Sequence, residues 1–239
     1  DYENVRSYVA KFISAKNDEI VFTSGATESV NLLANAYGQT NIKKGDIILI
    51  SEIEHHSNML PWTTLAKEKG AEIKKIPLNE NLMVDLNKLK LILSHRVKII
   101  AIHHISNVTG VMQNIKSIVD VAHRFNIPVF VDGAQAPSHV NIDVNQLNCD
   151  FYCFSGHKLF GPTGTGVLFI NSKHFELLTP YKTGGQMVDI ASIDEPKWAE
   201  MPLKLEAGTP NIAGVLGLGS AIEFTQEYSL DEISKKEEK

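Results

Sequence analysis

Residues 150–171 read "DFYCFSGHKLFGPTGTGVLFIN", in which two apolar runs flank a polar loop. The runs 151–155 and 166–171 are short and rich in aromatic and β-branched residues, which is typical of buried strands. The loop between them contains Lys158, and lysine is rarely buried without a partner or a chemical task. The amine of Lys158, just after a buried strand, is therefore the first candidate functional group.

The rest of the chain alternates between strand and helix patterns. Strands are predicted at 19–24, 46–51, 72–78, 97–105, 128–132, 151–155 and 166–171, and helices at 26–38, 60–69, 85–93, 115–125 and 213–228. Because most of these strands are apolar throughout rather than alternating, they favour a parallel sheet that is covered on both faces. We predict one three-layer α/β domain over residues 1–228, with a mainly parallel central sheet and helices on both faces.

Composition narrows the class of protein. The 239 residues carry a formal net charge of −5, with 43% hydrophobic and 21% charged residues, which is typical of a globular protein. A net negative charge disfavours nucleic-acid and membrane partners, which attract basic surfaces. Two cysteines form no disulfide framework and favour a reducing compartment. We expect the cytoplasm, although an organelle matrix or stroma has the same signature.

Polar residues follow the strands at the points where the strands end. These segments are 25–27, 54–56, 106–107, 132–135 and 155–158, and they contain hydroxyl, imidazole, amide, carboxylate and amine groups. Ligands of open α/β sheets bind outside the carboxyl ends of the strands. The five segments are therefore expected to meet at one edge of the sheet and to form one site.

The residues of this expected site match the needs of pyridoxal phosphate. A desolvated amine such as Lys158 forms a Schiff base with an aldehyde. A carboxylate at the end of an apolar strand, Asp132, needs a cation, and a protonated pyridine nitrogen supplies one. The segment "SGATES" at 24–29 opens a helix, and helix N-termini bind phosphate.

Six motifs in order carry a resemblance to a known family: "SGATESVNL", "EHHSNMLPW", "SNVTG", "VDGAQA", "FSGHKLFGPTG" and "EAGTPN". The chain resembles the group II, Suf-type cysteine desulfurases, within the class V aminotransferase superfamily and the fold type I class of pyridoxal-phosphate enzymes. The likeness runs from about residue 3 to about residue 228, and six motifs in order are far more specific than one.

The resemblance implies roles around the cofactor ring. Lys158 bonds to the cofactor aldehyde and then transfers protons, and Asp132 pairs with the ring nitrogen. Gln135 hydrogen-bonds the ring hydroxyl, and Asn107 lies near that hydroxyl and the substrate carboxylate. His55 stacks on the ring and assists proton transfer. The catalytic residues implied are thus Lys158 and His55.

The resemblance also implies a phosphate site and a dimer. The backbone of Ala26 and the side chains of Thr27, Ser155 and His157 hold the cofactor phosphate. Thr209, in "EAGTPN", reaches the phosphate of a neighbouring subunit, so a homodimer is implied.

The family reaction converts L-cysteine to L-alanine and leaves a persulfide on an enzyme cysteine, from which sulfur passes to an acceptor protein of iron–sulfur cluster assembly. In the family, that cysteine and the arginine that binds the substrate carboxylate lie in a smaller C-terminal domain. We therefore expect this chain to be truncated at both ends, with 229–239 starting the connection to that domain. The fragment is expected to bind the cofactor and to be inactive alone.

Other functions and sites remain open at this point. Selenocysteine lyase, another class V activity of the kynureninase or aminotransferase kind, and a non-catalytic cofactor-binding scaffold are the alternatives. The pairs at 55–56 and 103–104 suggest a metal, but neighbouring strand residues point to opposite faces and cannot chelate together. No metal site is expected, and only His55 of these four is given a functional role. Cys149 and Cys153 are expected to be small buried groups.

Overall fold

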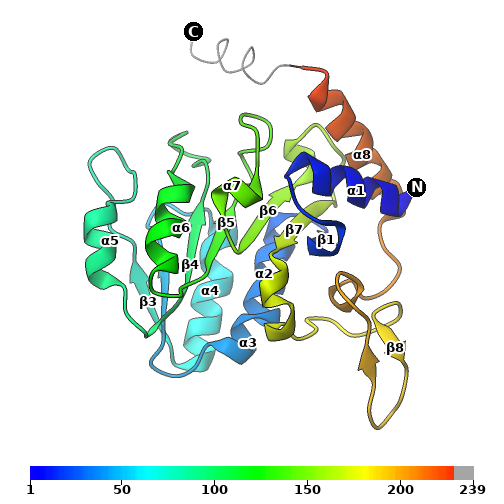
Figure 1. Ribbon diagram of the computed structural model, residues 1–239, viewed down its shortest axis with the longest axis horizontal. Helices are drawn as coiled ribbons and strands as arrows, with labels where there is room; N and C mark the ends of the chain where they lie inside the picture. The colour runs from blue at the N-terminus through cyan, green and yellow to red at the C-terminus, as the bar shows by residue number, and fades with distance from the viewer. Residues whose placement is uncertain (229–239) are drawn as a thin grey trace.

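A seven-stranded sheet forms the centre of the computed structural model, which describes residues 1–228 (Figure 1). The strand order is β1 (Ile20–Thr23), β7 (Gly166–Ile170), β6 (Phe151–Ser155), β5 (Val129–Asp132), β4 (Val97–His103), β2 (Ile47–Ile50) and β3 (Glu72–Lys75). Strand β7 runs antiparallel to both of its neighbours, and every other pair is parallel. The prediction of a mainly parallel sheet is confirmed.

The helices lie on both faces of this sheet. They are α1 (Tyr2–Phe12), α2 (Ala26–Ala36), α3 (Gly38–Asn41), α4 (His56–Lys69), α5 (Leu86–Ile92), α6 (Ile115–His123), α7 (Val144–Leu147) and α8 (Ile212–Gln226). Short 3₁₀ turns are η1 (Asn17–Glu19), η2 (Gly156–Lys158), η3 (Ser172–Leu177) and η4 (Leu203–Leu205).

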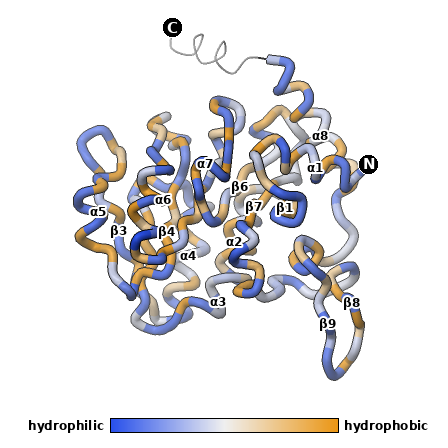
Figure 2. Tube along the Cα trace, viewed as in Figure 1, coloured by the Kyte–Doolittle hydropathy of each residue, from blue (hydrophilic) through white to orange (hydrophobic). Residues whose placement is uncertain are grey.

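Alternate residues of each strand face two separate hydrophobic cores. In β2, Ile47 and Leu49 belong to the core shared with α1, α5, α6 and α8, whereas Ile48 and Ile50 belong to the core shared with α2 and α4. The hydropathy colouring of Figure 2 accordingly runs hydrophobic along the central strands. This is the three-layer arrangement that the apolar strands predicted.

Some element boundaries differ from the sequence-based predictions for local reasons. Helix α4 begins at His56 rather than near 60, because the side chain of His55 caps it by accepting a hydrogen bond from the Ser57 N–H. The strand predicted over 72–78 ends at Lys75, shortly before Pro77, which has no N–H for a ladder. Asp85 caps α5 as predicted.

The segment between η3 and α8 contains a small hairpin that was not predicted. Strands β8 (Val188–Ile190) and β9 (Lys197–Trp198) pair with each other outside the main sheet, and Figure 1 shows them projecting from the body of the molecule.

Two features of the whole chain concern membrane spans and domain boundaries. Within residues 1–228, no helix is long and apolar enough to cross a membrane. The proposed connection at 229–239 lies outside the described residues, and the assignment of 1–228 as the cofactor-binding domain stays a prediction.

Candidate active site

A cavity of about 250 Å³ lies at the carboxyl ends of the central strands. The predicted residues that line it are Ala26, Thr27, His55, Asn107, Asp132, Gln135, Ser155, His157 and Lys158. They come from segments that follow β1, β2, β4, β5 and β6. The expectation that these strand ends meet at one edge of the sheet is therefore met.

Asp132 is the most deeply buried charged group of this cavity. It ends β5, between His103 of β4 and Cys153 of β6, and is only 5% exposed. One carboxylate oxygen, Oδ1, accepts a hydrogen bond from the Ala134 N–H at 3.0 Å. Burial raises the pKa of Asp132, and the nearby carboxylate of Glu54 raises that pKa further. A cation in the cavity would relieve both effects.

Lys158 is held by a tight loop after β6. Gly156 donates its N–H to the Thr165 carbonyl at 2.9 Å, and its own carbonyl accepts from Leu159 and Gly161. A Cβ at Gly156 would lie 2.3 Å from the Thr165 hydroxyl oxygen, so only glycine fits there. The Lys158 side chain is half-buried, and no hydrogen bond or ion pair of its amine is formed within residues 1–228. The amine is thus available to a bound molecule.

The other end of the cavity is formed by the N-terminus of α2. Ala26 donates its N–H to Ser155 Oγ at 2.8 Å, and the Thr27 and Ser57 hydroxyl oxygens lie 2.7 Å apart. A Cβ on Gly166 of β7 would lie 2.4 Å from the Gly25 Cα, so the helix start packs directly on that strand. Hydroxyls grouped at a helix N-terminus suit an anion such as a phosphate.

His55 has a capping role that the sequence did not indicate. Its Nδ1 accepts the Ser57 N–H at 3.1 Å, which leaves Nε2 as the nitrogen that carries the proton in the neutral ring. Its neighbour His56 is also exposed, with the two ring centroids 5.9 Å apart. Within the described residues, no group of histidines, cysteines and carboxylates could hold a metal ion.

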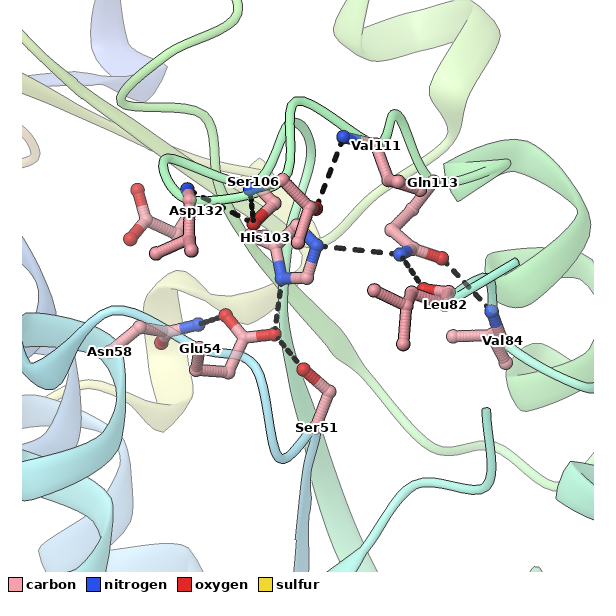
Figure 3. A network of polar contacts seen from close by, with 12 residues as sticks. Ser51, Glu54, Asn58, Leu82, Val84, His103, Ser106, Val111, Gln113 and Asp132 are labelled. Carbon is pink, nitrogen blue, oxygen red and sulfur yellow. Dashed lines mark hydrogen bonds and ion pairs between the residues drawn. The ribbon is translucent and has the colours of Figure 1, made fainter. Parts of the chain in front are cut away.

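Sequence reasoning missed part of the cavity. Ser57, His103, Ile105 and Ala134 also line it. His103 was interpreted as structural, yet its Nδ1 lies 2.6 Å from Glu54 Oε1 at the cavity wall (Figure 3). Its place as the last residue of β4 is the signal that could have identified it, because ligands of open α/β sheets bind at the carboxyl ends of the strands.

Several predicted or considered residues lie elsewhere. Thr209 is exposed and does not line the cavity. Cys149 and Cys153 are fully buried, and burial raises the pKa of each thiol. Arg6 is buried in ion pairs with Glu206 and Glu3, away from the cavity.

The family of the chain is shown by its match to a family model. The family model for "Aminotransferase class-V" matches residues 1–239, the whole of the chain. The chain belongs to the class V aminotransferase family. Pyridoxal phosphate is the cofactor of this family.

Two curated relatives of the chain are named as cysteine desulfurases. The chain is 44% identical over 237 residues to a "Probable cysteine desulfurase" of Halalkalibacterium halodurans. The aligned region covers 99% of this chain and 58% of the relative. It is 43% identical to a "Cysteine desulfurase" of Salmonella typhimurium, with 99% and 59% covered. The chain therefore spans somewhat more than half the length of these relatives.

Solved structures share this fold. The cysteine desulfurase CsdA of Escherichia coli superposes with a TM-score of 0.93 at 43% identity, over 96% of this chain and 58% of that one. The apo structure of a cysteine desulfurase from Thermococcus onnurineus NA1 also gives 0.93, at 37% identity over 98% and 58%. Fold type I, which the family resemblance implied, is confirmed.

The cavity of this class V aminotransferase fits the cofactor of its family. It offers a buried carboxylate that lacks a cation, an amine without a partner in residues 1–228, and a helix N-terminus lined by hydroxyls. A protonated pyridine nitrogen, an aldehyde and a phosphate would meet these three features in turn.

Proposed function

We propose that this chain is the cofactor-binding part of a pyridoxal-phosphate-dependent cysteine desulfurase. The observation that carries the proposal is that Asp132, the last residue of β5, and Lys158, which follows the adjacent strand β6, line one cavity. That cavity lies in a chain that is 43–44% identical to relatives named as cysteine desulfurases.

The chemistry of Lys158 and Asp132 supports their roles at the ring, and the family resemblance supports those of Gln135, Asn107 and His55. Pyridoxal phosphate, when bound, supplies an aldehyde for an amine and a protonated ring that accepts electrons. Lys158 provides the amine and afterwards moves a proton at its Nζ. Asp132 keeps the ring nitrogen protonated, because the buried carboxylate is stabilised only by a facing cation. Gln135 and Asn107 orient the ring hydroxyl, and His55 covers the ring face.

The phosphate is proposed to bind at the start of α2. The N–H groups of the first helical turn are left without helical partners, and they carry the positive end of the helix dipole. The Ala26 backbone and the side chains of Thr27, Ser155 and His157 would hold the anion. This explains why Gly25 and Gly166 must let the helix start approach β7 so closely.

The proposed substrate is L-cysteine, which loses its sulfur to a thiolate and leaves as L-alanine. Cys149 and Cys153 are excluded as that thiolate, because they are fully buried and burial raises their pKa. We propose that another cysteine receives the sulfur and passes it to an acceptor protein of iron–sulfur cluster assembly.

A homodimer and a cytoplasmic location belong to the same proposal. The exposed position of Thr209, away from the cavity of its own chain, supports a contact with a second subunit. The two unpaired cysteines support a reducing compartment such as the cytoplasm.

Absorption spectra test the proposed function. Titration with pyridoxal phosphate should give a visible absorption band, and that band should be missing from Lys158→Ala. Addition of L-cysteine should change the band, with L-selenocysteine and L-kynurenine as the competing substrates. A band that responds to L-kynurenine and not to L-cysteine would indicate another class V activity. Failure to form any band would contradict the proposal.

A further inference from the structure

A second buried carboxylate, Glu54, contacts His103, which lines the cavity, and Figure 3 shows the polar contacts around it. Its side chain is 0% exposed. Its Oε1 lies 2.6 Å from His103 Nδ1 and accepts a short hydrogen bond from Ser51 Oγ, and its Oε2 accepts from Asn58 Nδ2 at 2.7 Å. An ionised carboxylate accepts hydrogen bonds and donates none, so this ring of partners suits a negative charge.

The amide of Gln113 decides the protonation of His103. Gln113 Oε1 accepts the Val84 N–H at 3.0 Å, and its Nε2 donates to the Leu82 carbonyl at 2.9 Å. A flip of the amide would break both contacts with the backbone, so the orientation is fixed. The second hydrogen of Nε2 is left to face His103 Nε2, which lies 3.3 Å away.

His103 is therefore a neutral imidazole. Its Nε2 faces a donor and must act as an acceptor, so its single proton is on Nδ1 and is donated to Glu54. A charged ring would place two N–H donors, one from His103 and one from Gln113, against each other. His103 consequently brings no positive charge to offset a negative charge on Glu54.

The charge of the two carboxylates next to the cavity is balanced only in part. Lys158 and His55 lie near enough to lower the pKa of Asp132, but burial outweighs them and that pKa stays raised. In residues 1–228, no lysine or arginine lies within ion-pair distance of Glu54 or Asp132. His103 and Asp132 are paired in the register of β4 and β5, so Glu54 lies just one side chain behind the carboxylate that faces the cavity.

We propose that the cavity selects a cationic heterocycle through two carboxylates, Asp132 by contact and Glu54 through its field. His103 and Gln113 are positioning residues, which hold Glu54 in place while leaving its charge uncancelled. The inference rests on the proposed function, since the heterocycle is taken to be the pyridoxal phosphate ring with its nitrogen protonated.

The test compares two ligands that differ only at the ring nitrogen. These are pyridoxal phosphate and its carbocyclic analogue, in which a C–H group replaces that nitrogen. Glu54→Gln should weaken binding of pyridoxal phosphate by about tenfold, the change that corresponds to one pKa unit of the ring nitrogen. The measured quantity is the ratio of the two dissociation constants. A loss of folded protein in the variant does not alter this ratio, because both ligands bind the same folded state.

Control variants separate charge from packing. Glu54→Asp keeps the carboxylate and should restore the preference for pyridoxal phosphate over the analogue. Glu52→Gln makes the same chemical change at an exposed residue that pairs with Lys75, and it should leave both affinities unaltered. If Glu54→Gln weakens both ligands equally, the inference is wrong while the proposed function stands. Wild-type protein that binds neither ligand would contradict the proposed function itself.

A measurement on the wild-type chain covers the case in which Glu54→Gln does not fold. The ¹⁵N NMR signals of the His103 ring, assigned by their loss in His103→Asn, should show a neutral ring with its proton on Nδ1 at neutral pH. An imidazolium at His103 would cancel the charge of Glu54 and overturn the inference.

Discussion

Asp132 shows how a single side chain is prepared for a ligand. Its carboxylate is buried, one oxygen accepts the Ala134 N–H, and no basic side chain lies within ion-pair distance in residues 1–228. Burial raises its pKa above the ordinary value of a carboxyl group. Lys158 and His55 lower that pKa only in part, so a charged Asp132 without a bound cation beside it costs folding free energy.

Replacement of Asp132 by asparagine should separate stability from binding. In protein freed of cofactor, Asp132→Asn should raise the free energy of unfolding at neutral pH by about 1 kcal/mol, as is common where function maintains strain. The gain should disappear as the pH falls below the raised pKa of Asp132, because the wild-type carboxyl is then neutral. Urea unfolding at several pH values measures this.

The same variant should bind pyridoxal phosphate more weakly, because the ring nitrogen loses its anionic partner. Equilibrium titration followed by absorbance measures the loss. Unchanged affinity together with unchanged stability would contradict the role given to Asp132.

The sequence predicted which polar residues lie at the site better than it predicted their hydrogen-bond partners. Lys158 and Asp132 could be found because each follows an apolar strand. The opposite orientation of adjacent histidines was also correct, since His103 contacts Glu54 and His104 contacts Tyr152. The link from Glu54 to His103 spans 49 residues, and no local pattern indicates a contact of that range.

At the scale of elements, the start of α2 depends on close packing against β7. Gly25 has φ of +151°, and Gly166 lies so near that a Cβ would be 2.4 Å from the Gly25 Cα. The neighbouring strand β6 contributes Ser155, whose Oγ accepts the first N–H of the helix. The anion-binding end of the cavity is therefore set by where these elements meet.

Gly166→Ala should damage the phosphate end of the cavity selectively. The added methyl group would push the start of α2 away from β7, and misplaced backbone N–H groups bind an anion less well. Affinity should fall more for pyridoxal phosphate than for pyridoxal, which has no phosphate. Gly185→Ala is the matched control, because a Cβ there meets no atom within 4 Å. Equal losses for the two ligands would contradict this account.

The elements themselves were largely predictable, and the exceptions have physical causes. Apolar strands and 3.6-residue periodicity identify β4, β6 and α6. The reversed direction of β7 follows from the short loop 156–165, because a parallel return needs a crossover of a dozen residues or more. The β8–β9 hairpin is exposed and lacks an apolar run, so its sequence carries little signal.

At the scale of the whole molecule, Asp150 ties several elements together at the edge of the sheet opposite the cavity. Its buried carboxylate accepts hydrogen bonds from the Val129 N–H at 2.7 Å, and from His123 Nε2 and His174 Nε2 at 2.8 Å each. Lys173 Nζ lies 2.6 Å from the same group. Burial alone would raise the pKa of Asp150, but the hydrogen bonds from His123, His174 and Lys173 outweigh it and hold that pKa well below its usual range.

Asp150→Asn should lower the free energy of unfolding by about 3 kcal/mol at pH 7, because it breaks a buried charged network. Since the folded pKa of Asp150 is depressed, its contribution is present above the ordinary pKa of about 4 and is lost as the pH falls through the folded value. The difference between wild type and variant should therefore shrink in acid. Denaturant unfolding at neutral and acidic pH measures it.

Asp120→Asn is the control for this prediction. Asp120 forms an exposed ion pair with Lys116, and such pairs contribute between 0 and about 1 kcal/mol. An Asp150→Asn variant as stable as this control would show that the Asp150 network does not hold the elements together.

Attachment of pyridoxal phosphate to Lys158 is the central prediction for this chain. The direct measurement is to load the chain with pyridoxal phosphate, reduce it with borohydride, digest it and locate the added mass by peptide mass spectrometry. We predict that the mass lies on Lys158. Modification confined to a different lysine, or no modification at all, would contradict the account.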